Sequence, residues 1–152
     1  MVNMTDCTDE KKTSDTLNEA LSDAIEICWN SIDDLEERGG IIMFHSKDNK
    51  YQFVELYNEN HNTSIAPFLF TADRKDYAAK IIPMFKQGWV HYASFHTHPQ
   101  FAAIPSSEDN GVLFPGFPIN YIYSCVGNVL KRFEWLDGND LSHGYSATTV
   151  RI

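Results

Sequence analysis

The stretch FHTHPQFAAIPSSED, residues 95–109, contains the most informative spacing in the chain. Residues 89–97 form a β-prone run, which predicts a strand. Successive side chains of a strand point to opposite faces, so His96 and His98 project from the same face with their imidazoles close enough to share an ion. The loop that follows can return Asp109, from the first turn of a helix, as a third ligand.

The ligand types in this stretch indicate a catalytic zinc site. Two neutral imidazoles and one carboxylate, with a fourth position left to water, are typical of a catalytic Zn²⁺ and not of a closed structural site. Hydrolysis also needs a base near the activated water. Glu37 is the candidate if the predicted strand 41–45 lies beside the histidine strand, and Glu55 is the alternative. Ser106 can donate a hydrogen bond to an oxyanion, although its spacing to Asp109 also matches a helix capping box.

This spacing resembles the signature of the JAMM/MPN (JAB domain) zinc metalloproteases. That signature is an upstream glutamate, then H-x-H-P, seven residues, S, two residues and D. The fixed positions are occupied here by His96, His98, Pro99, Ser106 and Asp109. The family's glutamate precedes a glycine–hydrophobic pair by three residues. Glu37 has this place before Gly40-Ile41, whereas Glu36 is one residue out of register.

The resemblance spans roughly residues 37–136 and implies a cytidine-deaminase-like α/β fold, a mixed sheet flanked by helices. It implies zinc-dependent cleavage of a peptide or isopeptide bond in a protein or peptide substrate, ubiquitin-like proteins included. The implied site has Glu37 as general acid/base, Ser106 as oxyanion donor, and Zn²⁺ on His96, His98 and Asp109.

The resemblance also leaves alternatives open. The segment after Asp109 is cut short by Gly111 and by residues 115–118, and we find no obvious insertions for gripping ubiquitin chains. The chain is therefore more similar to compact bacterial-type JAB-like members than to the eukaryotic deubiquitinating ones. A non-catalytic MPN scaffold that binds partners through its surface is the alternative function.

Periodicity and turn residues predict the other elements of one α/β domain over residues 14–152, after a disordered acidic lead over 1–13. We expect a helix capped by Ser14 or Asp15 and ended by Arg38-Gly39-Gly40. A second helix begins at residues 71–74 with Thr71 as cap, is kinked or shortened by Pro83, and ends at Gly88. A short helix is expected from Ser106. The expected strands besides 89–97 are 41–45, 51–57, 119–126, 129–136 and 145–152.

Two expectations concern side chains near the histidine strand. By parity along the strand, His91 lies on the opposite face from His96, so we expect it not to be a ligand. The aromatic residues of this region are expected in the core or a pocket wall, and an exposed Phe101 near the metal loop would instead indicate recognition. These aromatic residues are Trp89, Tyr92, Phe95, Phe101, Phe114 and Phe117.

Composition excludes several classes of protein. The 152 residues suit one globular domain, and the net charge of −9 argues against nucleic acid or an anionic membrane as partner. Residues 1–37 carry eleven acids and two bases, so the whole excess of negative charge lies there, and we interpret it as a solvated helix face rather than a docking surface.

Without an apolar run of about 18 residues or an apolar leader, a cytoplasmic location is expected. The three cysteines form neither a disulfide framework nor a thiolate metal site; they are Cys7, Cys28 and Cys125.

Overall fold

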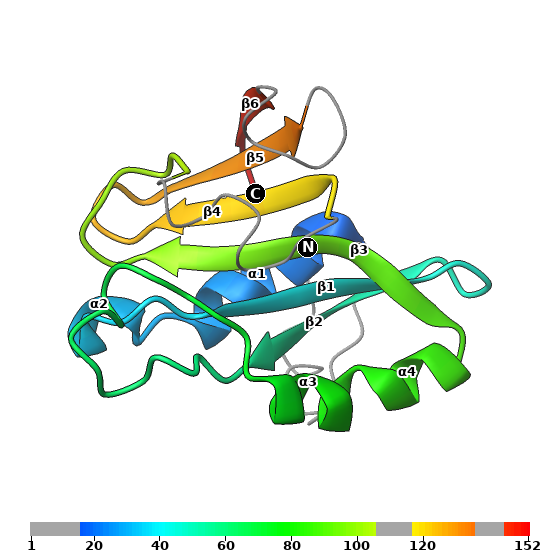
Figure 1. The fold of residues 1–152 in the computed structure, drawn as a ribbon. Coiled ribbons are helices and arrows are strands. Elements are labelled where there is room, and N and C mark those ends of the chain that lie inside the picture. Colours follow the sequence, from blue (N-terminus) through cyan, green and yellow to red (C-terminus); the bar gives the residue numbers. More distant parts are fainter. Residues whose placement is uncertain (1–15, 106–116, 136–144) are drawn as a thin grey trace.

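A computed structural model describes residues 16–105, 117–135 and 145–152 (Figure 1). The elements of these ranges, in chain order, are α1 (Leu17–Ile27), α2 (Ser31–Asp34), β1 (Gly39–His45), β2 (Lys50–Leu56), α3 (Arg74–Lys80), α4 (Ile82–Lys86), β3 (Trp89–His98), β4 (Ile119–Ser124), β5 (Val129–Trp135) and β6 (Tyr145–Val150). The acidic lead and the short helix expected from Ser106 lie outside the described residues.

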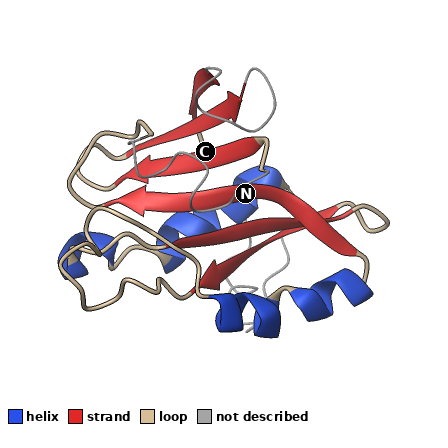
Figure 2. Cartoon of the chain, in the orientation of Figure 1, coloured by secondary structure: helices blue, strands red, loops and turns tan. Residues whose placement is uncertain are grey.

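The strands form a six-stranded sheet in the order β2-β1-β3-β4-β5-β6 (Figure 2). β3 and β4 are parallel, and every other neighbouring pair is antiparallel. This confirms the predicted mixed α/β sheet. The two hairpins are also confirmed: Asn49 and Asn128 take positive φ values of 55° and 51° in the turns that join β1 to β2 and β4 to β5.

The first helix is shorter than expected. Its N-cap is Thr16, whose side chain and that of Glu19 form a capping box, so the predicted cap at Ser14 or Asp15 is wrong. The helix predicted to run to Arg38 is instead interrupted after Ile27, and the short α2 ends at Leu35 in the left-handed conformation. The hydrophobic periodicity did not predict this break, because Cys28 and Ser31 on the two sides of the turn are both buried and continue the buried face of the helix.

The second predicted helix begins later than expected. Asp73, not Thr71, is the N-cap of α3, because its carboxylate accepts from the backbone N–H of Asp76. The expected effect of Pro83 is confirmed, since the helix is divided at Ile81 into α3 and α4 and the proline lies in the first turn of α4. The helix α4 ends at Lys86, and Gly88, with φ of 95°, is the last turn residue before β3.

Helices cover both faces of the β2-β1-β3 half of the sheet (Figure 1). On one face, α1 packs on a core formed by Ala20, Leu21, Ala24, Cys28, Ile42, Phe53, Ala93, Phe95, Tyr121, Tyr123 and Leu130. On the other face, α3 and α4 pack on a core formed by Ile41, Met43, Leu56, Phe70, Ile81, Trp89 and Phe117. Next to it, loop residue Ala103 packs with Ile122 and Phe133 of β4 and β5. The candidate site lies on this second face.

A β-bulge in β3 overturns the parity argument for His91. Met43 pairs with His91 while Ile41 pairs with Ser94, so one extra residue is inserted in β3. His91 consequently lies on the same face as His96, not the opposite one. It stacks on Phe117, 4.7 Å between ring centroids, and its Nε2 is 2.9 Å from the Tyr77 hydroxyl, away from the histidine pair.

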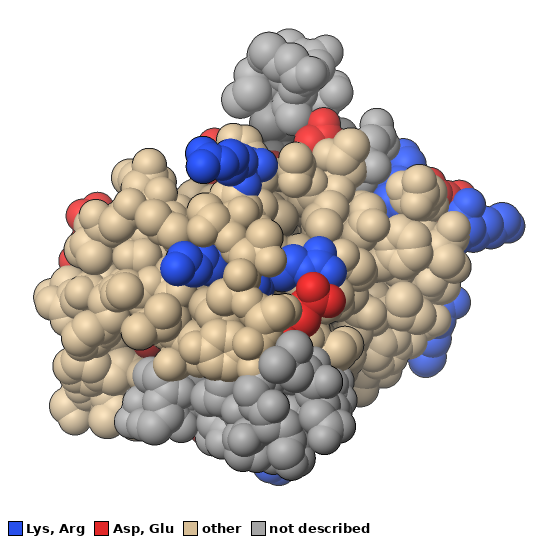
Figure 3. Space-filling view, turned by 90° about the horizontal axis from the view of Figure 1, so that it is seen from above, with Lys and Arg blue, Asp and Glu red and all other residues tan. Residues whose placement is uncertain are grey.

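Charged side chains are dispersed over the surface that Figure 3 shows. Among the described residues on that face, lysines and arginines are separated by uncharged side chains and form no continuous basic surface. Within the same described ranges, no helix is both long enough and apolar enough to cross a membrane.

Candidate metal centre

The antiparallel pairing of β1 with β3 brings Glu37 to the two histidines. Gly39 pairs with His96, so the residues just before β1 lie beside the end of β3. The backbone N–H of Thr97 donates to the Arg38 carbonyl at 2.8 Å, which extends this register by one step. Gly39 permits the close approach, because a Cβ there would lie 2.2 Å from the Phe95 carbonyl oxygen and 2.8 Å from the His96 Cβ.

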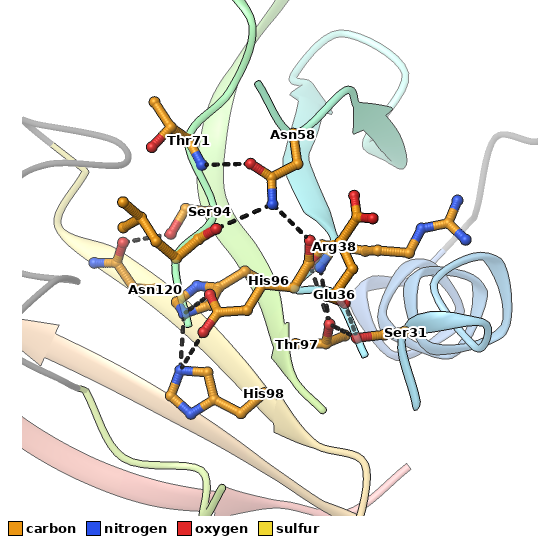
Figure 4. Close-up of polar contacts among 12 residues, drawn as sticks. Ser31, Glu36, Arg38, Asn58, Thr71, Ser94, His96, Thr97, His98 and Asn120 are labelled. Atoms are coloured by element: carbon orange, nitrogen blue, oxygen red, sulfur yellow. Dashed lines mark hydrogen bonds and ion pairs between the residues drawn. The ribbon is translucent and has the colours of Figure 1, made fainter. Parts of the chain in front are cut away.

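Glu37, His96 and His98 form a buried cluster. Their exposed fractions are 1%, 3% and 2%. The two Nε2 atoms of the histidines are 3.2 Å apart, and Figure 4 shows the rings directed toward each other. The Glu37 carboxylate oxygens lie 3.9 Å from Nε2 of His96 and 3.7 Å from Nε2 of His98. Each of the three residues contributes one ligand atom, and these three atoms lie within 4.8 Å of one another. Such a group can hold a metal ion.

The donor atoms suit Zn²⁺. Nδ1 of His98 is 2.8 Å from the Ala102 carbonyl oxygen, which can only accept, so Nδ1 carries the proton and Nε2 presents its lone pair. Tetrahedral Zn²⁺ with Zn–N bonds of about 2.0–2.1 Å separates two nitrogens by about 3.3 Å. The observed 3.2 Å between the Nε2 atoms fits that spacing. Metal identity is not fixed by these two nitrogens and one carboxylate, since several divalent ions accept them.

The backbone of Glu37 is fixed by two loop residues that were not among the predicted site residues. Its N–H donates to the Ala66 carbonyl at 2.8 Å, and its carbonyl accepts from Nδ2 of Asn58 at 2.9 Å. Asn58 is itself buried, and its Nδ2 also donates to the Leu69 carbonyl. Figure 4 shows Asn58 joining this region to Thr71. The loop after β2 therefore holds the carboxylate-bearing residue in place.

Thr97, between the two histidines, fixes the same segment from the other side. Its hydroxyl oxygen accepts from the Arg38 backbone N–H at 3.0 Å and lies 2.6 Å from the Ser31 hydroxyl, which in turn donates to the Glu36 carbonyl. Ser31 and Thr97 are both buried. These contacts attach the chain before β1 to β3 on either side of Glu37.

Other carboxylates considered from the sequence have different partners. Glu55 forms an ion pair with Arg38, whose Nε lies 2.9 Å from Oε2 of Glu55. Burial alone would lower the pKa of Arg38, but the hydrogen bond and charge of Glu55 raise it overall, so the guanidinium stays charged. Glu36 pairs with His61, Oε1 to Nδ1, at 2.7 Å. Neither carboxylate joins the described cluster.

Two residues of the expected site, Ser106 and Asp109, lie outside the described residues. The sequence analysis did not select Asn58, Thr97 or Ala102. Asn58 bonds to the Glu37 carbonyl and Ala102 to His98, whereas Thr97 bonds to the backbone of Arg38, next to Glu37. For Asn58 the only signal was a polar run, which also describes an ordinary loop. Ala102 acts through its carbonyl, which carries no side-chain signal at all.

Comparison with known proteins identifies the family. The family model described as prokaryotic homologs of the JAB domain matches residues 31–136. Among solved structures, the chain is similar to the solution structure of a protein from Desulfitobacterium hafniense, with 21% identity, a TM-score of 0.57, and coverage of 88% of this chain and 87% of that one. That likeness shows the fold. A comparison with curated proteins found no match. The chain therefore belongs to the prokaryotic family of JAB-domain homologs.

Proposed function

We propose that the protein is a zinc-dependent hydrolase that cleaves a peptide or isopeptide bond in a protein or peptide substrate. The observation that carries the proposal is the buried convergence of Glu37, His96 and His98 at the end of β3. A carboxylate and two imidazoles this close together, in a domain of this family, are suited to metal-assisted attack of water on a carbonyl.

Each residue has a proposed role. His96 and His98 hold the metal through Nε2, and Asp109, on the evidence of its spacing, supplies the third ligand. A bound Zn²⁺ supplies Lewis-acid character and lowers the pKa of water to about 7. Glu37 accepts a proton from the attacking water and delivers it to the departing amine. Ser106 donates a hydrogen bond to the oxyanion of the substrate carbonyl.

Metal content and cleavage, measured together on the full chain, test these roles. His98→Ala should lose both bound zinc and cleavage, because it removes a ligand. Glu37→Gln keeps the size of the side chain but cannot accept a proton, so it should retain zinc and lose cleavage. Glu55→Gln is the matched control and should retain both, because Glu55 pairs with Arg38 outside the cluster.

Three outcomes would change the proposal. Undiminished zinc in His98→Ala would remove the metal site as assigned. Loss of zinc in Glu37→Gln would make Glu37 a ligand instead of the base. Full zinc occupancy with no cleavage of any linked substrate would favour the non-catalytic scaffold.

A further inference from the structure

We propose that the substrate carries a bulky apolar side chain beside the bond that is cleaved, and that Phe68, Phe101 and Ile104 bind it. This inference rests on the proposed hydrolase function. A pocket of about 440 Å³ opens at the metal centre, lined by Glu37, Phe68, His98, Phe101, Ala102, Ile104 and Pro105. A ligand in this pocket therefore contacts two members of the candidate centre directly.

The pocket wall exposes three large apolar side chains. Phe68, Phe101 and Ile104 are 45%, 47% and 53% exposed. They come from two separate loops, and the ring centroids of Phe68 and Phe101 lie 5.7 Å apart. Large apolar side chains gathered at one concave place, instead of scattered singly, mark a binding surface. The exposed Phe101 is also the arrangement that would indicate recognition rather than core packing.

The loop that carries Phe101 is anchored to the metal centre. The Ala102 carbonyl bonds to Nδ1 of His98, and the Phe101 carbonyl accepts from the hydroxyl of Ser124 at 2.8 Å. Ser124 is buried at the end of β4, beside His98. The wall is thus held at a fixed place relative to the histidine, which is what a preformed specificity pocket requires.

The chemistry of the lining selects one substrate class. Among the described residues that line the pocket, Glu37 and His98 are the titratable ones, and both belong to the candidate centre. The other described lining residues offer apolar surface without a charge to pair with a basic or acidic side chain. A Gly-Gly tail would leave this surface wet because glycine has no side chain. Phenylalanine, leucine or methionine beside the scissile amide would cover it.

Cleavage of a matched substrate series tests the inference. The zinc-loaded full chain is given peptides that differ only beside the scissile amide, with Gly, Ala, Leu or Phe, and a Gly-Gly isopeptide. We expect kcat/KM to be at least about tenfold higher for Leu and Phe than for Gly. Phe101→Ala should lower kcat/KM for the Phe peptide about tenfold and leave the Gly peptide unchanged. Phe85→Ala is the control, since Phe85 is similarly exposed, at 43%, but lies on α4.

A binding measurement separates this inference from the proposed function. Glu37→Gln protein, which should not turn over substrate, is titrated calorimetrically with the Phe and Gly peptides, with and without Phe101→Ala. If the protein binds the Phe peptide more tightly than the Gly peptide, and this preference is lost in Phe101→Ala, the apolar pocket is supported even when no peptide is cleaved. Binding without cleavage would therefore overturn the hydrolase function alone. Equal cleavage of Gly and Phe substrates would overturn the pocket and keep the hydrolase. Absence of both cleavage and binding would overturn both.

Discussion

Asn58→Ala tests whether one buried amide holds the carboxylate-bearing segment in place. The side chain makes five hydrogen bonds: Nδ2 donates to the carbonyls of Glu37 and Leu69, and Oδ1 accepts from the backbone and side chain of Asn60 and the backbone of Thr71. Each bond contributes about 0.5–1.5 kcal/mol, and the Glu37 carbonyl that loses its donor is buried. Allowing for non-additivity, the free energy of unfolding should fall by about 3–5 kcal/mol.

Urea denaturation followed by tryptophan fluorescence measures the loss. Asn30→Ala is the matched control, since Asn30 is exposed and makes no side-chain capping bond, and it should change stability by less than about 0.5 kcal/mol. Amide hydrogen exchange adds a local readout. The N–H groups of Asn60 and Thr71 donate to Asn58 and should exchange faster than those of β1 in the variant.

A loss for Asn58→Ala no larger than that of the control, below about 0.5 kcal/mol, would refute the reasoning. It would mean that water replaces the amide without cost, and that the loop does not need Asn58 to hold the Glu37 carbonyl. Unchanged exchange at Thr71 would lead to the same conclusion from an independent measurement.

Two further predictions concern the sheet. Gly39→Ala should lower stability by about 3 kcal/mol or more and weaken zinc binding, because its Cβ would overlap the Phe95 carbonyl and the His96 Cβ. Thermal melts and zinc titration check this. Gly127→Ala should lower stability clearly less, because the nearest atom to its new Cβ would be the Ser124 Oγ at 3.2 Å. Burial raises the pKa of Tyr121 to about 12, although the charge of Arg132 acts to lower it. The folded state keeps this proton between about pH 10 and 12, where the unfolded state loses it, so stability should fall as the pH rises above 10, by up to roughly 2–3 kcal/mol. Tyr121→Phe should flatten that slope in denaturation curves measured at pH 9 to 12, and an equally steep slope in the variant would contradict the assignment.

The sheet was predictable from the sequence because its strands are marked by local patterns. Runs of β-prone residues between turn residues located β1 to β6, and Asn49 and Asn128 supplied the turns. The bulge in β3 was not predictable, because it depends on how β1 pairs across from it, and it reversed the face assigned to His91. The break between α1 and α2 was hidden for a similar reason: the residues on both sides of the turn are buried in the same stripe.

The side chains that form the described cluster were predictable from the sequence, but the groups that hold them in place were not. The spacing of His96 and His98 predicts their common face, and Glu37 was selected by its place three residues before the glycine–hydrophobic pair Gly40-Ile41. The supporting groups were not predictable, because they act through contacts between distant segments. Asn58 reaches the Glu37 backbone across 21 residues and Thr97 reaches Arg38 across 59 residues, and neither contact leaves a periodic pattern.

The two loops that form the apolar wall are also the loops that hold the reactive residues. The Ala66 carbonyl, two residues before Phe68, accepts from the Glu37 N–H, and the Ala102 carbonyl, next to Phe101, bonds to Nδ1 of His98. An apolar side chain that packs against both Phe68 and Phe101, whose rings contact each other, therefore restrains both loops, and through them Glu37 and His98. Binding energy from this side chain can then be used to position the groups that act in the transition state. If so, replacing Phe by Gly beside the scissile amide should lower kcat in the peptide series, whereas a pocket that only adds affinity would raise KM and leave kcat unchanged.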